Sequence, residues 1–174
     1  MDRVVPCPPT LSCRDFKWKM VHAVIRKMKK SDYLAVDRLL KQLHKVHMTG
    51  RPELFVDMAH PCSQEFFDNL VSNKEVISIL AEINHKAVGV CIVSMLNESG
   101  MIQMKTAYVD ELVVDERCRR RGIGKALFQE AERRARKLGA QRIDLMVWSF
   151  NENAIKAYDA YGMTPQRHIY EKHL

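Results

Sequence analysis

The sequence lacks any hydrophobic run long enough to cross a membrane as a helix. Its longest uncharged apolar stretch, residues 87–96, is far shorter than the ~20 residues that a membrane-spanning helix needs. No basic segment followed by an apolar one opens the chain, so we expect no secretory signal. Hydrophobic residues make up 47% and charged residues 28%. This composition is typical of a folded globular protein and excludes disordered and collagen-like chains.

The sequence also lacks any cysteine pattern typical of a metal site, because its cysteines are scattered along the chain. The five cysteines are odd in number, and no two are spaced as C-x-x-C. The seven histidines do not cluster with them as zinc ligands would. We therefore expect a reduced, cytoplasmic protein with free thiols and no metal site.

The length of 174 residues predicts a single domain. Residues 1–19 contain Pro6, Pro8 and Pro9 and develop no apolar period, so they are expected to form a disordered leader or an extension. The folded domain is predicted to cover residues 20–174.

The net charge of +7 is concentrated in one part of the chain. Residues 115–138 contain nine basic and four acidic residues and so carry +5 of the total. Such a concentration favours an anionic partner, either a phosphorylated cofactor or a nucleic-acid backbone. The nucleic-acid interpretation is weakened because residues 117–138 contain only one aromatic residue for base stacking, Phe128.

Hydrophobic periodicity predicts strands and helices that alternate through the second half of the chain. Strands are predicted over residues 21–28, 76–82, 87–96, 107–114, 142–148 and 167–172. Helices are predicted from an N-cap at Ser31 to about residue 47, and over residues 63–71, 123–138 and 152–161. In the second helix Phe66, Phe67 and Leu70 are expected to face inward. The pattern predicts an α/β protein with one mixed sheet and helices on its faces.

The sharpest local motif, Arg119-Arg120-Arg121-Gly122-Ile123-Gly124, lies between a buried strand and a strongly amphipathic helix. Backbone N–H groups at a helix start, with glycines removing side-chain obstruction, form a cradle for anions. The motif matches neither the dinucleotide fingerprint nor the nucleotide-triphosphate loop. On these residues alone, a turn with a solvated basic face explains it equally well.

The wider sequence resembles the GNAT superfamily of N-acetyltransferases. Arg119, Gly122 and Gly124 fill the fixed positions of its acetyl-CoA motif, [Q/R]-x-x-G-x-[G/A], after the strand that contains Leu112-Val113-Val114. A second pattern follows as Leu145-x-Val147 and Asn151-x-x-Ala154-Ile155-x-x-Tyr158, with Gly162-Met163 after it. Met163 stands where the family usually has Phe. The resemblance covers about residues 20–174.

The resemblance implies a mixed, mostly antiparallel sheet whose two central parallel strands splay apart, with flanking helices. The pantetheine arm of acetyl-CoA would pair with the backbone of the strand at Leu112, Val113 and Val114. The pyrophosphate would lie on the loop and helix start formed by Arg119, Arg120, Arg121, Gly122, Ile123, Gly124 and Lys125. Asn151 would contact the cofactor beside the wedge between the two strands.

Two catalytic residues are implied by the same resemblance. Glu111 stands where many family members carry the base that takes a proton from the amine; the alternative is a strand-face charge or a salt-bridge partner. Strand alternation places Asp110 on the opposite face, which makes it the weaker candidate. Tyr158 matches the tyrosine that protonates the departing CoA thiolate, and the alternative is a core aromatic residue.

The predicted function is direct transfer of acetyl from acetyl-CoA to a primary amine of a small molecule, in a ternary complex. A peptide or protein acceptor is the alternative within the family. A non-catalytic CoA-binding sensor or a basic nucleic-acid-binding module is the alternative outside it. The family's acceptor site involves the region 44–60, where His44, His47, Phe55 and His60 are each interpreted as packing or surface residues. The sequence leaves a homodimer open.

Overall fold

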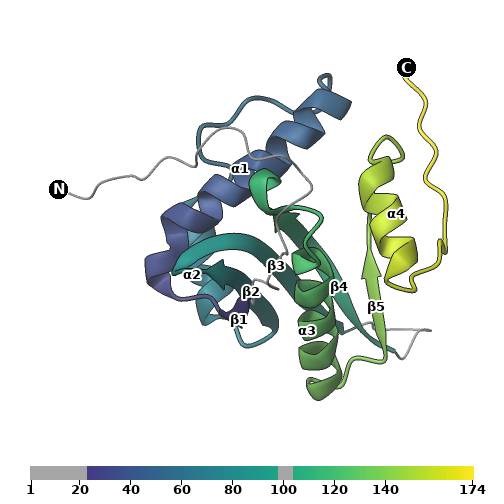
Figure 1. Ribbon diagram of the computed structural model, residues 1–174. Coiled ribbons are helices and arrows are strands. Elements are labelled where there is room, and N and C mark those ends of the chain that lie inside the picture. The colour runs from purple at the N-terminus through teal and green to yellow at the C-terminus, as the bar shows by residue number, and fades with distance from the viewer. Residues whose placement is uncertain (1–22, 98–103) are drawn as a thin grey trace, which may run out of the picture.

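The computed structural model describes residues 23–97 and 104–174, and its centre is one five-stranded sheet in the order β1-β2-β3-β4-β5 (Figure 1). The strands are β1 Val24–Lys27, β2 Val76–Ile83, β3 Lys86–Asn97, β4 Lys105–Val114 and β5 Arg142–Leu145. Neighbouring strands from β1 to β4 are antiparallel, whereas β4 and β5 are parallel. The predicted single mixed, mostly antiparallel sheet is confirmed. The proposed leader, residues 1–19, lies outside the described residues.

Helices cover both faces of this sheet. Helices α1 (Tyr33–Gly50) and α2 (Gln64–Ser72) pack on one face, and α3 (Ile123–Lys137) packs on the other (Figure 1). Helix α4 (Glu152–Ala160) lies beside β5. Short 3-10 turns, η1 (Lys30–Asp32) and η2 (Glu116–Cys118), precede α1 and α3.

Strand alternation divides the buried side chains between two cores. On β2, Ile77 and Ile79 face α3, whereas Leu80 faces α1 and α2. Phe128 of α3 and Phe67 of α2 are almost completely buried on these opposite faces. The sheet therefore has a core on each face, and residues of its strand β4, next to the edge strand β5, pack into both cores.

Several predicted details are wrong in the structure. Ser31 does not cap α1, because the chain first makes η1 and the Asp32 carboxylate accepts a hydrogen bond from Lys29 N at 2.7 Å. Phe66 is 49% exposed, while Phe67 and Leu70 point inward as predicted. Strand β5 ends at Leu145, and the segment 167–172 forms no strand.

The sheet is split where its parallel strands β4 and β5 approach their carboxyl ends. Strand β4 pairs with β5 only over Thr106–Val109, matched to Arg142–Leu145. Beyond Val109, β4 continues for five residues to Val114 without a β5 partner. The parallel strands thus separate after four pairs and leave a wedge beside the second half of β4, as expected from the sequence. No helix among the described residues is long and apolar enough to cross a membrane.

Candidate active site

The unpaired second half of β4 forms one side of the wedge. Antiparallel pairing with β3 holds its other edge, with Val113 opposite Val90 and Val114 opposite Gly89. Leu112 and Val114 pack toward α3, whereas Val113 is buried toward α1. The three residues predicted to pair with the pantetheine arm therefore lie on a strand fixed on three sides, with its β5 edge left without a strand partner.

A β-bulge at Asp110 changes which way the acidic residues of β4 point. Glu111 pairs with Ile92 and Val109 pairs with Val93, so Asp110 is an extra residue on β4. Ile92 and Ser94 share one face of β3, and Ser94 Oγ donates a hydrogen bond to Asp110 Oδ2 at 2.6 Å. Both Asp110 and Glu111 therefore lie on the face covered by α1. The expectation that alternation separates them is wrong, because the bulge breaks the alternation.

The pKa of the Glu111 carboxyl is shifted into the range in which a carboxyl can take up a proton near neutral pH. Burial, followed by repulsion from Asp110, raises the pKa of Glu111 to about 7. Burial also raises the pKa of Asp110, although hydrogen bonds from Ser94 oppose the shift. Near neutral pH the protonated and ionised forms of Glu111 are therefore both present. A general base is most effective when its pKa lies near the working pH.

The loop after β4 has the backbone shape of an anion cradle. Arg120 and Gly122 adopt positive φ angles of 61° and 76°, and Gly122 is the N-cap of α3. Such turns direct backbone N–H groups toward one concavity at a helix start. A Cβ on Gly122 would meet nothing within 4 Å, so the space in front of the loop is open. This open, basic loop fits a phosphorylated group.

The predicted cradle residues differ in what their side chains do. Arg119 Nε donates to Val114 O at 3.1 Å, and Arg121 Nη2 donates to Arg117 O at 3.2 Å, so both guanidinium groups brace the loop. Ile123 is buried in the core against the sheet, whereas Lys125 is exposed. A Cβ on Gly124 would lie 3.0 Å from Tyr161 Oη, which shows how closely α3 and the end of α4 approach each other.

Tyr158 lies on the inner side of α4, among aromatic residues. Its ring centroid is 6.5 Å from that of Phe128 and 6.1 Å from that of Tyr161. Burial raises the pKa of Tyr158 to about 12, with smaller contributions from Cys91, Tyr161 and Glu111. The phenol is therefore protonated at neutral pH. Tyr158 packs against Phe128 on the α3 side of the sheet, whereas Glu111 lies on the face covered by α1.

Asn151 has a structural role that the motif did not indicate. It is the N-cap of α4, and its Oδ1 accepts a hydrogen bond from Ala154 N at 3.3 Å. The residue thereby fixes where α4 begins. Its predicted contact with the cofactor would have to be made by the other end of the same amide.

An aromatic cluster joins His47 and Phe55, two residues of the acceptor region 44–60, to Trp148, whose part in it sequence reasoning missed. The Phe55 ring lies between His47 and Trp148, with centroid distances of 5.2 and 6.0 Å. The Arg51 guanidinium lies 5.0 Å from the centre of the Trp148 ring. This cluster ties the loop after α1 to the segment after β5. The separation of these residues in sequence gave no signal that they meet.

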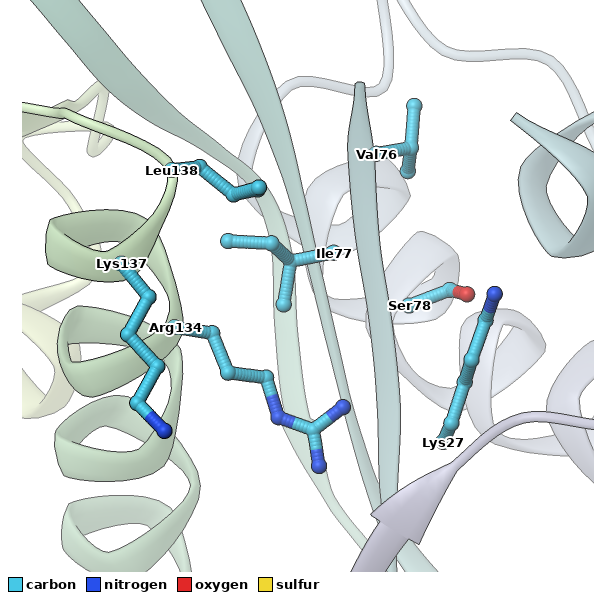
Figure 2. Close-up of a pocket in the computed structure, with 7 residues that line it drawn as sticks. All are labelled: Lys27, Val76, Ile77, Ser78, Arg134, Lys137 and Leu138. Atoms are coloured by element: carbon cyan, nitrogen blue, oxygen red, sulfur yellow. The ribbon is translucent and has the colours of Figure 1, made fainter. Parts of the chain in front are cut away.

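Other features of the described residues lie apart from this site. A pocket of about 240 Å³ opens between the end of α3 and the start of β2, where Ile77 and Leu138 lie close to the basic Arg134 and Lys137 (Figure 2). It is at the opposite end of α3 from the cradle. In the described ranges, no three His, Cys, Asp or Glu side chains converge as a metal site would require.

Comparisons with known proteins agree with this geometry. The model of the acetyltransferase (GNAT) family matches residues 40–163. An uncharacterised N-acetyltransferase of Methanocaldococcus jannaschii is 32% identical over 97 residues, which are 56% of this chain and 43% of that protein. The match thus spans less than half of that relative's length.

Solved structures share the fold. A mutant of the Bacillus halodurans protein BH1408 superposes with a TM-score of 0.84 at 26% identity, covering 87% of this chain and 99% of that one. The aminoglycoside N-acetyltransferase AAC(6')-Iy, solved with CoA, superposes with a TM-score of 0.69 at 18% identity, covering 87% and 95%. Because the family model matches well over half of the sequence, this chain belongs to the acetyltransferase (GNAT) family.

Proposed function

We propose that this protein transfers the acetyl group of acetyl-CoA directly to a primary amine of a small molecule, in a ternary complex. The observation that carries the proposal is the wedge beside β4. There the β4 edge beyond Val109 has no β5 partner, the cradle at Gly122 that follows β4 is open, and Glu111 on the same part of β4 has a carboxyl pKa of about 7.

The residues around the cradle and the wedge would hold the acyl donor. Backbone N–H groups from Arg120 to Gly124 would bind its phosphates, and the exposed Lys125 would add positive charge. The β5-facing edge of Leu112, Val113 and Val114 would pair with its amide-containing arm. Acetyl-CoA, when bound, supplies a thioester whose carbonyl carbon accepts the amine.

Each proton transfer has a residue suited to it. The Glu111 carboxylate would take a proton from the acceptor ammonium, because only the neutral amine has the lone pair that attacks the carbonyl carbon. Backbone N–H groups near Val113 and Val114 would stabilise the negative charge that develops on the carbonyl oxygen. The Tyr158 hydroxyl, which is protonated at neutral pH, would donate to the sulfur as the carbon–sulfur bond breaks.

Turnover by matched variants tests this proposal. CoA release is measured with acetyl-CoA and a panel of primary amines. Tyr158→Phe keeps the ring beside Phe128 but removes the phenolic proton. It should lower kcat by ~10²-fold while leaving acetyl-CoA affinity nearly unchanged. Tyr170→Phe, at an exposed position in the C-terminal segment, is the control and should leave kcat unchanged. CoA release from no amine, even though acetyl-CoA binds, would favour a non-catalytic sensor.

A peptide or protein acceptor remains the second candidate within the family. An open groove in the acceptor region would favour a peptide or protein, whereas a pocket closed on all sides would favour a small molecule. The solved AAC(6')-Iy structure with a CoA-acetylneamine bisubstrate analogue has the same fold with a small-molecule amine moiety bound. Comparison of kcat/KM for free amines and lysine-containing peptides distinguishes the two acceptors.

Further predictions about the whole protein are also proposals. The folded domain is proposed to cover residues 20–174, and the protein is proposed to act in the cytoplasm. A homodimer is checked by light scattering of the purified protein. Tight, saturable binding of DNA or RNA would instead favour the nucleic-acid-binding alternative.

A further inference from the structure

The hydroxyl of Tyr161 reaches from the end of α4 to the start of α3. A Cβ on Gly124, the second residue of α3, would lie 3.0 Å from Tyr161 Oη and 3.6 Å from Val114 Cγ2. Val114 is the last residue of β4 and belongs to the part of that strand that has no β5 partner. The Tyr161 hydroxyl therefore lies where the unpaired edge of β4 meets the phosphate cradle.

The turn that ends α4 fixes the position of this side chain. Tyr161 is the C-cap residue of α4, and its N–H donates to Ala157 O at 3.0 Å. Gly162 follows with a φ of 87°, the left-handed conformation that commonly ends a helix. The Tyr161 ring centroid lies 5.3 Å from that of Phe128 on α3. The ring is thus held both by its own helix and by the helix that it faces.

The packing of the Tyr161 ring leaves its hydroxyl unexplained. Phenylalanine would make the same contact with Phe128, so the ring alone does not require an oxygen. In residues 23–97 and 104–174, no hydrogen bond joins the Tyr161 hydroxyl to another protein group. The Tyr33 hydroxyl, in contrast, donates to Cys62 O at 3.1 Å. Burial raises the pKa of Tyr161 above its ordinary value near 10, so the hydroxyl keeps its proton at neutral pH and can donate it.

Backbone N–H groups without helical acceptors lie beside the same hydroxyl. The N–H of Ala126 donates to the N-cap carbonyl, Gly122 O, at 3.0 Å. The N–H groups of Ile123, Gly124 and Lys125 precede that bond, so they have no acceptor inside the helix. A phosphate at this helix start would therefore be met by backbone N–H groups and, next to Gly124, by a phenolic O–H.

We propose that Tyr161 is a further acetyl-CoA-binding residue, whose hydroxyl donates a hydrogen bond to the pyrophosphate where the cradle meets β4. Glycine at position 124 leaves the room that this hydroxyl occupies. The two sequence patterns leave residue 161 unspecified, so neither of them indicated this role. The inference rests on the proposed acetyl-CoA site and adds a residue to it.

Tyr161→Phe removes the hydroxyl and keeps the ring beside Phe128. We expect the dissociation constant of acetyl-CoA, measured by calorimetric titration of the full chain, to rise by about tenfold, the effect of losing one hydrogen bond to a charged group. KM for acetyl-CoA should rise in parallel. Because the pyrophosphate takes no part in the bond changes, kcat at saturating acetyl-CoA should change by less than about twofold. This split is the reverse of that expected for Tyr158→Phe.

Tyr170→Phe, at an exposed position, is the matched control and should change neither affinity nor KM. Melting of each variant without ligand confirms that it is folded. If Tyr161→Phe lowers kcat as strongly as Tyr158→Phe does and leaves affinity unchanged, the Tyr161 hydroxyl acts in the chemical step, and the inference is overturned.

Gly124→Ala tests the contact between the two residues. The added Cβ forces the Tyr161 hydroxyl to move by a few tenths of an ångström, so acetyl-CoA affinity should fall several-fold. In the Tyr161→Phe background no hydroxyl meets the Cβ, and Gly124→Ala should then have almost no further effect. An equal loss in both backgrounds would show that the methyl group obstructs the cradle directly, and it would overturn the role given to Gly124.

Dephospho-CoA shows which part of the ligand the hydroxyl contacts, because it keeps the pyrophosphate and lacks the phosphate on the ribose. Tyr161→Phe should weaken the binding of CoA and of dephospho-CoA by the same factor. A loss that appears with CoA but not with dephospho-CoA would assign the hydroxyl to the ribose phosphate and overturn the inference.

The outcomes distinguish this inference from the proposed function. If Tyr161→Phe and the wild type bind acetyl-CoA equally well, the inference is overturned and acetyl transfer stands. If the wild type binds acetyl-CoA but releases CoA with no amine, acetyl transfer fails, whereas a tenfold loss of affinity in Tyr161→Phe still supports the inference. If the wild type does not bind acetyl-CoA, both fail.

Discussion

The guanidinium of Arg38 on α1 binds the carboxylate of Asp115, the residue directly after β4, with Nη1 2.5 Å from Oδ2. Arg38 Nη2 also donates to Ala87 O at 2.9 Å. Asp115 in turn accepts a hydrogen bond from Arg117 N and so caps η2, the turn that leads into the cradle. Burial alone would raise the pKa of Asp115, but the hydrogen bonds from Arg38 and Arg117 outweigh it and lower the pKa. Helix α1 is thereby connected to the start of the proposed phosphate-binding loop.

Removal of this connection should weaken acetyl-CoA binding at a distance. Arg38→Met keeps much of the aliphatic stem but leaves the Asp115 carboxylate with fewer donors. We expect a loss of ~1 kcal/mol in the free energy of unfolding, because the Arg38 side chain is about half-exposed although Asp115 is largely buried. Acetyl-CoA affinity should fall several-fold, as measured by calorimetric titration. Lys41→Met, at an exposed position of the same helix, is the control and should change neither quantity.

The conformation of Gly122 gives a prediction that separates backbone strain from side-chain bulk. At φ 76° a β-branched residue is strongly disfavoured, whereas asparagine tolerates the left-handed region. Because a Cβ meets no protein atom there, the cost is conformational and not steric. Gly122→Val should destabilise the fold by ~1–2 kcal/mol and abolish stabilisation by acetyl-CoA in melting experiments. Gly122→Asn should keep the fold and most of that stabilisation. Equal binding by the parent and Gly122→Val would show that the cradle lies elsewhere.

The raised pKa of Glu111 predicts a specific pH–rate profile. A carboxyl with a pKa of about 7 becomes ionised as the pH rises. The logarithm of kcat/KM should therefore increase with unit slope against pH up to about pH 7 and then level off. Glu111→Gln should remove this break, with the largest loss of rate at and above pH ~7, where the wild-type carboxylate is ionised. Asp110→Asn tests whether Glu111 is the group that causes the break. It removes a charge that raises the pKa of Glu111, so the break should persist but move to lower pH.

The same pKa shift predicts that Glu111 limits stability at alkaline pH. A folded-state pKa raised from 4.5 to about 7 means that the folded protein favours the neutral acid. The stability contributed by this group is therefore complete below pH ~4.5 and is lost as the pH rises through about 7. Since each pKa unit corresponds to ~1.4 kcal/mol and partial exposure reduces the effect, Glu111→Gln should gain ~2 kcal/mol at pH ~8.

Thermal melting of the two proteins measures this gain as a few degrees in Tm. At pH ~5 the two melting temperatures should nearly coincide. Glu65→Gln, at an exposed position in the first turn of α2, serves as the comparison and should show no gain that grows with pH. Identical melting temperatures of Glu111→Gln and wild type at both pH values would mean that the carboxylate is not penalised by burial.

Much of the fold follows from local patterns in the sequence. The break between the two apolar runs 76–82 and 87–96 predicts a turn between them, and the structure has a hairpin there, with Asn84 and His85 at positive φ. The glycine motif predicted a loop that enters a helix start, and Gly122 adopts the left-handed conformation that explains the choice of glycine. These features depend on neighbouring residues, so the sequence is sufficient to predict them.

Features that depend on distant partners could not be predicted in the same way. The bulge at Asp110 is decided by pairing with β3, and one extra residue reverses the face of every residue that follows. The segment 167–172 alternates like a strand but forms none, because a strand needs an edge to pair with and not only a pattern. The burial of Asp37 did have a local signal in the sequence, since its carboxylate interrupts the apolar stripe of α1 beside Val36 and Leu40.

The short ladder between β4 and β5 has a consequence for how the molecule moves. Four residue pairs, the packing of Tyr158 and Tyr161 against Phe128, and the contact of Trp148 with Phe55 connect the segment from β5 to α4 to the rest of the molecule. A segment held by so few backbone hydrogen bonds is expected to open as a cooperative unit well before the whole chain unfolds. A molecule in the wedge would bridge both sides and close that opening. Amide hydrogen exchange in β5 and α4 should therefore slow markedly when the wedge is filled, whereas exchange in β2 and β3 should hardly change.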